Sequence, residues 1–139
     1  MAISDHLTVR NIIKGLISFQ FFAGVGLTLM GFGILAVPAE LGQVCKHGYY
    51  AVFGVDIEPA LGLKVVGLSK ILGIIALNGF LGRSLEFISN LCLLLPSYAA
   101  YQGHKKLGDN SEIAPLISCV FCVLLLLLPK PTTKNTKTE

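Results

Sequence analysis

The run LISFQFFAGVGLTLMGFGILAVPA, residues 16–39, decides the fold class, because it contains no charged residue and its most polar side chain is Gln20. The hydrocarbon core of a bilayer is about 30 Å thick, and a helix of about 20 apolar residues crosses it. Arg10 and Lys14 precede the run, and Glu40 follows it. These boundaries predict a membrane-spanning helix over residues 16–39.

Three more apolar runs follow, at residues 63–81, 84–101 and 113–128. The chain of 139 residues is 53% hydrophobic and 14% charged, whereas soluble proteins carry about a quarter charged residues. A single segment in lipid satisfies its backbone hydrogen bonds only as a helix. We therefore predict one all-α domain over residues 1–139, an integral membrane four-helix bundle, with a polar C-terminal tail at residues 129–139.

The long segment between the first two spans, residues 41–62, is expected to lie at the membrane interface rather than to cross it. It includes the aromatic stretch GYYAVFG at residues 48–54. Tyrosines favour the boundary between lipid and water. A crossing would also bury Lys46 and His47, which is costly in lipid.

The second and third predicted spans are joined only by Gly82 and Arg83, so they should form an antiparallel hairpin. Four spans place both termini on one side of the membrane. That side carries six basic residues: Arg10, Lys14, Arg83, Lys130, Lys134 and Lys137. The other side carries four or five. This bias favours the positive side (cytoplasmic, matrix or stromal) for both termini. It suits a mitochondrial inner, thylakoid or endoplasmic reticulum membrane equally.

One face of the first predicted helix carries small or polar residues. Its members follow one another at helical spacing: Gln20, Gly24, Thr28 and Gly31. Small residues let helices approach closely in lipid. This stripe therefore predicts either internal packing within the bundle or a docking face for another subunit, and we favour internal packing.

Four polar side chains interrupt the second and third spans: Lys70, Asn78, Glu86 and Asn90. Glu86 falls in a first helical turn, where the helix dipole favours an anion. We expect it to pair with Arg83, and a proton or ligand site is the alternative. Lys70 is expected to extend its amine towards the surface, or else to serve as a substrate counter-ion. Its predicted partners lie on the same side of the membrane: Glu40, His104, Asp109 and Glu112.

Cys119 and Cys122 form a Cys-x-x-Cys in the fourth predicted helix and share one face of it. In this respect the chain is similar to vitamin K epoxide reductase, a four-helix bundle with such a pair in its last helix. That similarity implies a quinone-linked thiol oxidoreductase. The chemistry also needs a second thiol pair outside the lipid, and the long segment offers only Cys45. We favour cysteine as a small apolar residue here, with the redox pair as the alternative.

The remaining patterns exclude several classes of site. His6, His47 and His104 are far apart in the sequence and show no metal-ligand spacing. No phosphate-binding loop occurs. The lysines form no basic stripe, so nucleic acid is not a predicted partner. We predict no bound cofactor, with lipid or quinone contact left open.

From residue 62 to 128 the order of features resembles the DoxX-like family of small four-helix membrane proteins. The resemblance rests on Gly67–Leu77, which opens a helix, and on the His-x-x-x-Gly-Asp pattern within Ala99–Asp109, before an apolar helix led by Pro115. Some members of that family resemble subunits of a terminal quinol oxidase, and others resemble endoplasmic reticulum chaperones for receptor assembly.

The expected function is therefore non-catalytic. The resemblance and the missing catalytic pattern favour an accessory or structural subunit, or an assembly factor, of a larger membrane complex such as a respiratory or other electron-transfer complex. Its expected partners are the lipid bilayer and other membrane-protein subunits. The alternatives are the thiol oxidoreductase described above and a small oligomeric transporter that works through Lys70 or Glu86.

Overall fold

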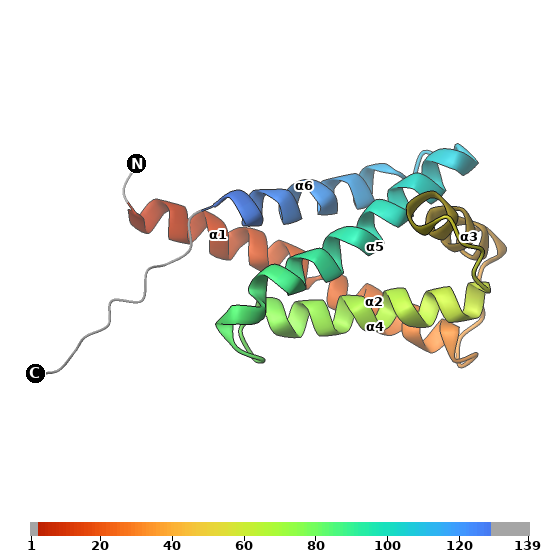
Figure 1. Cartoon of the computed structure of the whole chain (residues 1–139), viewed down its shortest axis with the longest axis horizontal. Helices are drawn as coiled ribbons and strands as arrows, with labels where there is room; N and C mark the ends of the chain where they lie inside the picture. Colours follow the sequence, from red (N-terminus) through yellow and green to blue (C-terminus); the bar gives the residue numbers. More distant parts are fainter. Residues whose placement is uncertain (1–2, 129–139) are drawn as a thin grey trace, which may run out of the picture.

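A computed structural model describes residues 3–128 of the chain, with side chains from Val9 onward except that of Arg83. The predicted polar tail, residues 129–139, lies outside the described residues. Within them the fold is entirely helical and contains no strand, which confirms the all-α prediction (Figure 1). The elements are α1 (Ile3–Ser18), α2 (Gln20–Gly31), α3 (Ala39–Phe53), α4 (Pro59–Leu77), the short 3-10 helix η1 (Arg83–Leu85), α5 (Glu86–Leu107) and α6 (Ile113–Leu127).

The first apolar helix lies nearer the N-terminus than predicted. α1 and α2 follow one another with a break only at Phe19, and the apolar part of the pair runs over Val9–Gly31. The helix ends there because Gly33 takes a left-handed conformation, with φ of +76°. The Gly33 N–H then donates to the carbonyl of Met30 at 3.0 Å, and the Ile34 N–H donates to that of Leu29 at 2.9 Å. This glycine-based C-cap stops the helix before the apolar sequence does, so the predicted end at residue 39 is wrong.

Glycines also set the ends of α4 and α5. Gly79, with φ of +84°, closes α4 at Leu77, four residues before the predicted end. Gly108, with φ of +65°, closes α5 at Leu107, whereas we predicted an end at residue 101. The extra turn carries basic residues, which interact favourably with the C-terminal end of the helix dipole. Residues 102–107, between the third and fourth predicted spans, are therefore helical.

The long helices run lengthwise, and their ends gather in two groups (Figure 1). The start of α1, the turn at residues 78–85 and the end of α6 lie at one end of the molecule. The segment after α2 and the segment before α6 lie at the other, together with α3. α2 packs against α4, and α5 packs against α4 and α6. The hydrophobic core lies where these helices meet, around Ile17, Leu77 and Leu93.

Most of the segment predicted to lie at the interface, residues 41–62, forms α3, which Figure 1 shows nearly end-on, across the direction of α4. Its last four residues belong instead to α4, which begins at Pro59. α3 packs against α5 through two glycines. A Cβ on Gly48 would collide with the carbonyl of Ala99, and one on Gly103 would collide with the carbonyl of Val44. Backbone contact of this kind fixes α3 to the bundle.

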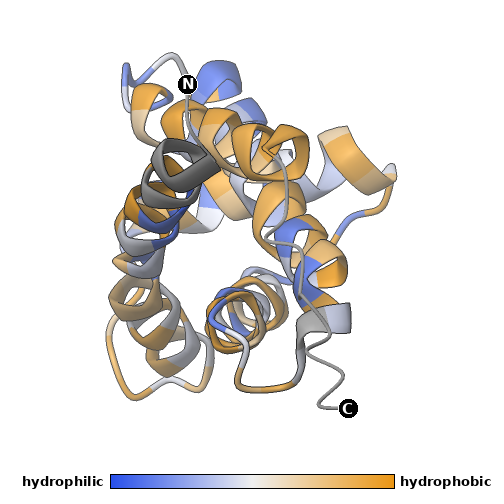
Figure 2. Ribbon diagram, turned by 90° about the vertical axis from the view of Figure 1, so that its left-hand side faces the viewer, coloured by the Kyte–Doolittle hydropathy of each residue, from blue (hydrophilic) through white to orange (hydrophobic). Residues whose placement is uncertain are grey.

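Apolar residues make up much of every long helix, as the hydropathy colours of Figure 2 show, and many of their large side chains are exposed. On α6 the exposed members include Ile113, Ile117, Val120 and Leu127. By length and composition two helices could cross a membrane, Val9–Gly31 and α4, and α6 is a shorter apolar helix. Large exposed apolar surfaces in a protein mark contact with a membrane or another protein.

Candidate functional site

A buried ionic cluster joins three helices at the end of the bundle where α1 begins. Arg10 of α1 is only 2% exposed and forms an ion pair with Glu86, the first residue of α5. The other guanidinium nitrogen donates to the carbonyls of Leu125 at 2.9 Å and Leu128 at 3.2 Å, at the end of α6. Lys14 Nζ lies 3.1 Å from the same Glu86 carboxylate. One arginine therefore connects the start of α5 to the end of α6.

The electrostatics of this cluster favour a structural role. Glu86 sits at the positive end of the α5 dipole, and Arg10 sits at the negative end of the α6 dipole. Glu86 therefore forms helix-end ion pairs with Arg10 and Lys14. The Arg83 side chain, which we predicted as its partner, lies outside the described side chains. Sequence reasoning treated Arg10 as a flanking charge. Arg10 and Lys14 are four residues apart and therefore share a helix face. This spacing could have indicated that both meet the same carboxylate.

A second polar chain crosses the middle of the bundle. Lys70 Nζ of α4 donates to Gln20 Oε1 of α2 at 2.8 Å. Gln20 Nε2 then donates to Ser118 Oγ of α6 at 2.9 Å. The predicted acidic partners of Lys70 are wrong, because its bond in the structure is to an amide oxygen. Two of those acids, Glu40 and Asp109, lie outside the bundle, where both are exposed.

The small-residue stripe of the first helix faces α4. A Cβ on Gly24 would lie 3.0 Å from the carbonyl oxygen of Gly67, and one on Gly31 would lie 2.7 Å from the backbone nitrogen of Lys64. A Cβ on Gly67 would in turn collide with Thr28. These glycines bring the two backbones together, so α4 occupies this face and leaves it unavailable to another subunit.

The two asparagines singled out in the sequence have different surroundings. Asn78 links α4 to α1, because its Nδ2 donates to Ser18 Oγ at 3.1 Å and to the Ile74 carbonyl at 2.9 Å. Asn90 is only 1% exposed, and within the described part of the chain its Oδ1 has no hydrogen-bond partner. Asn78 thus acts at a helix end, whereas Asn90 is a polar group inside the bundle.

The cysteines of the Cys-x-x-Cys are unpaired in the structure and differ in burial. Cys122 is completely enclosed in the core, and Cys119 is half-buried. The sequence showed no base beside them, but the fold connects Lys70 through Gln20 to Ser118, the residue before Cys119. In the part of the chain with described side chains, from Val9 to Leu128 without Arg83, no group of three or more His, Cys, Asp or Glu side chains is placed to hold a metal ion.

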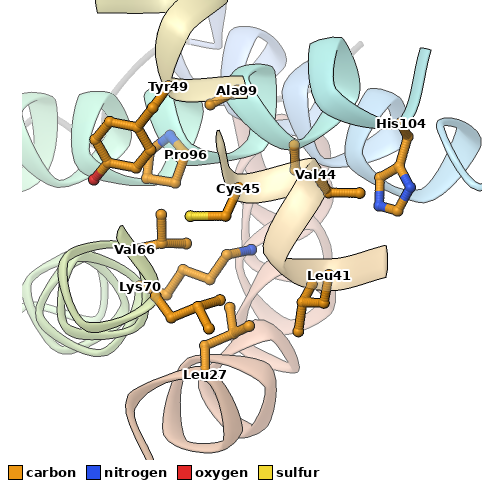
Figure 3. Close-up of a pocket in the computed structure, with 12 residues that line it drawn as sticks. Leu27, Leu41, Val44, Cys45, Tyr49, Val66, Lys70, Pro96, Ala99 and His104 are labelled. Atoms are coloured by element: carbon orange, nitrogen blue, oxygen red, sulfur yellow. The ribbon is translucent and has the colours of Figure 1, made fainter. Parts of the chain in front are cut away.

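The Lys70 side chain also lines a cavity of about 100 Å³ (Figure 3). Its walls are mostly apolar, with Leu27 and Val66 among them, and its polar members come from α3, α4 and α5: Cys45, Tyr49, Lys70 and His104. Burial raises the pKa of the Cys45 thiol to about 11, so this thiol is protonated at neutral pH. Sequence reasoning missed the cavity, because its residues are far apart in the chain.

Comparison with known proteins adds no identification. The chain matches no family model, no curated protein and no solved structure. The DoxX-like resemblance of residues 62–128 therefore stays an expectation drawn from the sequence.

Proposed function

We propose that this chain is a multi-pass membrane protein that crosses the bilayer four times. The two apolar helices Val9–Gly31 and α4 support this proposal by length and composition. So does the grouping of helix ends in Figure 1, which suits four lengthwise helices with α3 lying along one membrane surface. In this topology both termini face the positive side of the membrane.

We further propose that it works without catalysis, as an accessory subunit or assembly factor of a larger membrane complex. The observation that carries this proposal is the distribution of polarity. The ion pair of Arg10 and Glu86 and the chain through Lys70 and Gln20 are directed inward and join helices. The exposed surface of α6 is largely apolar along its length. A protein built in this way presents surfaces to lipid and to neighbouring helices.

The test is purification in a mild detergent, followed by mass spectrometry of the co-purifying proteins. A reproducible set of integral membrane subunits in constant ratio supports the proposal. A chain that purifies alone from membranes, and whose deletion leaves every membrane complex at its normal size on native gels, contradicts it.

The thiol oxidoreductase is the second candidate, favoured by the chain of hydrogen bonds from Lys70 through Gln20 to Ser118, the residue before Cys119. In that reaction the two thiols would lose two electrons and two protons to a quinone and form a disulfide. The double variant Cys119→Ala/Cys122→Ala separates the two candidates. Loss of quinone-linked thiol oxidation with normal complex assembly supports the enzyme, and unchanged oxidation rates in membranes refute it.

A further inference from the structure

The cavity beside Lys70 combines an apolar wall with one cationic group. Figure 3 shows the Lys70 side chain extending among Leu27, Leu41 and Cys45, with its nitrogen directed into the cavity. The neighbouring Val66 and Pro96 are apolar. A site of this composition suits a ligand that is largely hydrocarbon and has a single polar end.

The charge of Lys70 specifies that polar end. An ammonium group has three N–H donors, and one of them is directed to Gln20 Oε1. Among the described side chains, those of residues 9–128 without Arg83, the lysine forms no ion pair with a carboxylate. A cation in apolar surroundings favours an anionic partner, because water cannot solvate it there. One monoanion balances one lysine, whereas a phosphate monoester would bring nearly two negative charges.

A second cavity provides a place for the hydrocarbon. Its volume is about 190 Å³, and it lies between α4 and α5 beside Val65, Leu91 and Leu95. The two cavities share four wall residues, Tyr49, Val66, Pro96 and Ala99. The two cavities therefore adjoin at these residues, with the Lys70 side chain in the first and a largely apolar lining in the second.

We propose that these adjoining cavities bind a free fatty acid, with its carboxylate on the Lys70 ammonium and its chain against Val66 and Pro96. The carboxylate accepts hydrogen bonds from the lysine donors that Gln20 does not use. The bilayer supplies such molecules directly. The inference goes beyond the proposed role as a subunit and does not depend on which proteins surround the chain.

The experiment uses the full chain in nanodiscs of phosphatidylcholine, with empty nanodiscs as background. The probe is cis-parinaric acid, a fluorescent fatty acid, and its methyl ester is the uncharged match. We expect saturable binding of about one acid per chain, at least tenfold tighter than the ester, because a hydrogen bond to a charged group contributes about 1.5–3 kcal/mol. If the unmodified protein binds acid and ester with equal affinity, or if binding does not saturate, the proposal is overturned.

Three variants locate the site. Lys70→Met should remove the preference for the acid and leave ester binding unchanged. Lys64→Met is the matched control, because Lys64 lies on the same helix but over the Phe32 ring, with its nitrogen 4.8 Å from the ring centre. Val66→Phe should weaken the binding of both the acid and the ester, because the larger side chain would fill space where the two cavities adjoin. If Lys64→Met lowers the acid preference as much as Lys70→Met does, the charge acts at long range and the assigned site is wrong.

Discussion

Replacing Glu86 by glutamine should destabilise the bundle by about 3 kcal/mol. The change keeps the shape of the side chain but leaves the Arg10 guanidinium, which is 2% exposed, without its anion. Removing one partner of a buried ion pair costs about 3–5 kcal/mol, because the other charge stays buried. Arg10 retains the carbonyls of Leu125 and Leu128 in this variant. We therefore expect the lower end of that range.

The second cation of the cluster adds little to this effect. The Lys14 side chain is 22% exposed, so it can turn towards solvent or headgroups when the carboxylate is gone. Ion pairs with such an exposed partner contribute about 0–1 kcal/mol. The loss therefore depends on Arg10, and Arg10→Met should show a cost of similar size, since Glu86 is then left with Lys14 alone.

A double-mutant cycle tests this reasoning. Contacting residues in one ionic network typically couple by about 0.5–3 kcal/mol, so Arg10→Met/Glu86→Gln should be about 2 kcal/mol less destabilised than the sum of the single variants. The assay is chemical unfolding in detergent, followed with a thiol-reactive dye. The protein's own free cysteines report unfolding, because Cys45 and Cys122 are buried in the folded chain.

An exposed carboxylate provides the control. Glu40→Gln makes the same chemical change on the exposed surface of α3, and it should alter the free energy of unfolding by no more than about 0.5 kcal/mol. The reasoning is refuted if Glu86→Gln is as mild as Glu40→Gln, or if the single-variant costs add without coupling.

Three further predictions follow from other contacts. Gly31→Leu should destabilise the pairing of α2 with α4 by about 1–3 kcal/mol or more, measured by the same unfolding assay, because its first side-chain carbon would lie 2.9 Å from the Ala60 carbonyl. Cys45 should react slowly with maleimide at pH 8, since burial raises its pKa to about 11 and keeps the thiol protonated. The variant Lys46→Cys, at an exposed position, should react quickly from one side of the membrane. The hydrogen bond from His104 lowers the pKa of Asp109, so this contact is present above the usual carboxyl pKa and is lost as the pH falls through the lowered value. An NMR titration of His104→Ala should show the pKa of Asp109 returning towards its usual range.

Each of these has its own control. Leu29→Phe changes a partly exposed position of the same helix as Gly31 and should leave stability nearly unchanged; equal losses in the two variants would contradict the close packing. Cys45 faces Gly62 of α4, so its inaccessibility says nothing about the membrane side of α3. Rapid labelling of Cys45 would instead show that α3 is not fixed to the bundle. An Asp109 titration that is identical with and without the His104 side chain would exclude their contact.

The apolar runs alone were enough to predict a helical chain with apolar residues on its outside. Long apolar runs permit only helices in lipid, and the runs at residues 63–81 and 113–128 predicted both ends of α4 and α6 to within four residues. The glycine C-caps decided where α2 and α4 end, and these were predicted less well because Gly33 and Gly79 also occur within apolar runs that continue past them. The sequence shows where the glycines are, but only the backbone angles of the structure show which of them adopt a left-handed conformation and end a helix.

The partners of the polar residues were decided only by the tertiary structure. Arg10 and Glu86 are 76 positions apart in the chain, and Lys70 and Gln20 are 50 apart. No spacing rule connects such residues, because helical periodicity fixes which face a side chain occupies but not which helix packs against that face. The stripe of Gly24 and Gly31 illustrates the division. Its existence is visible in the sequence, yet its use in packing on α4 depends on the neighbour that the fold places there, and so does the cavity around Lys70.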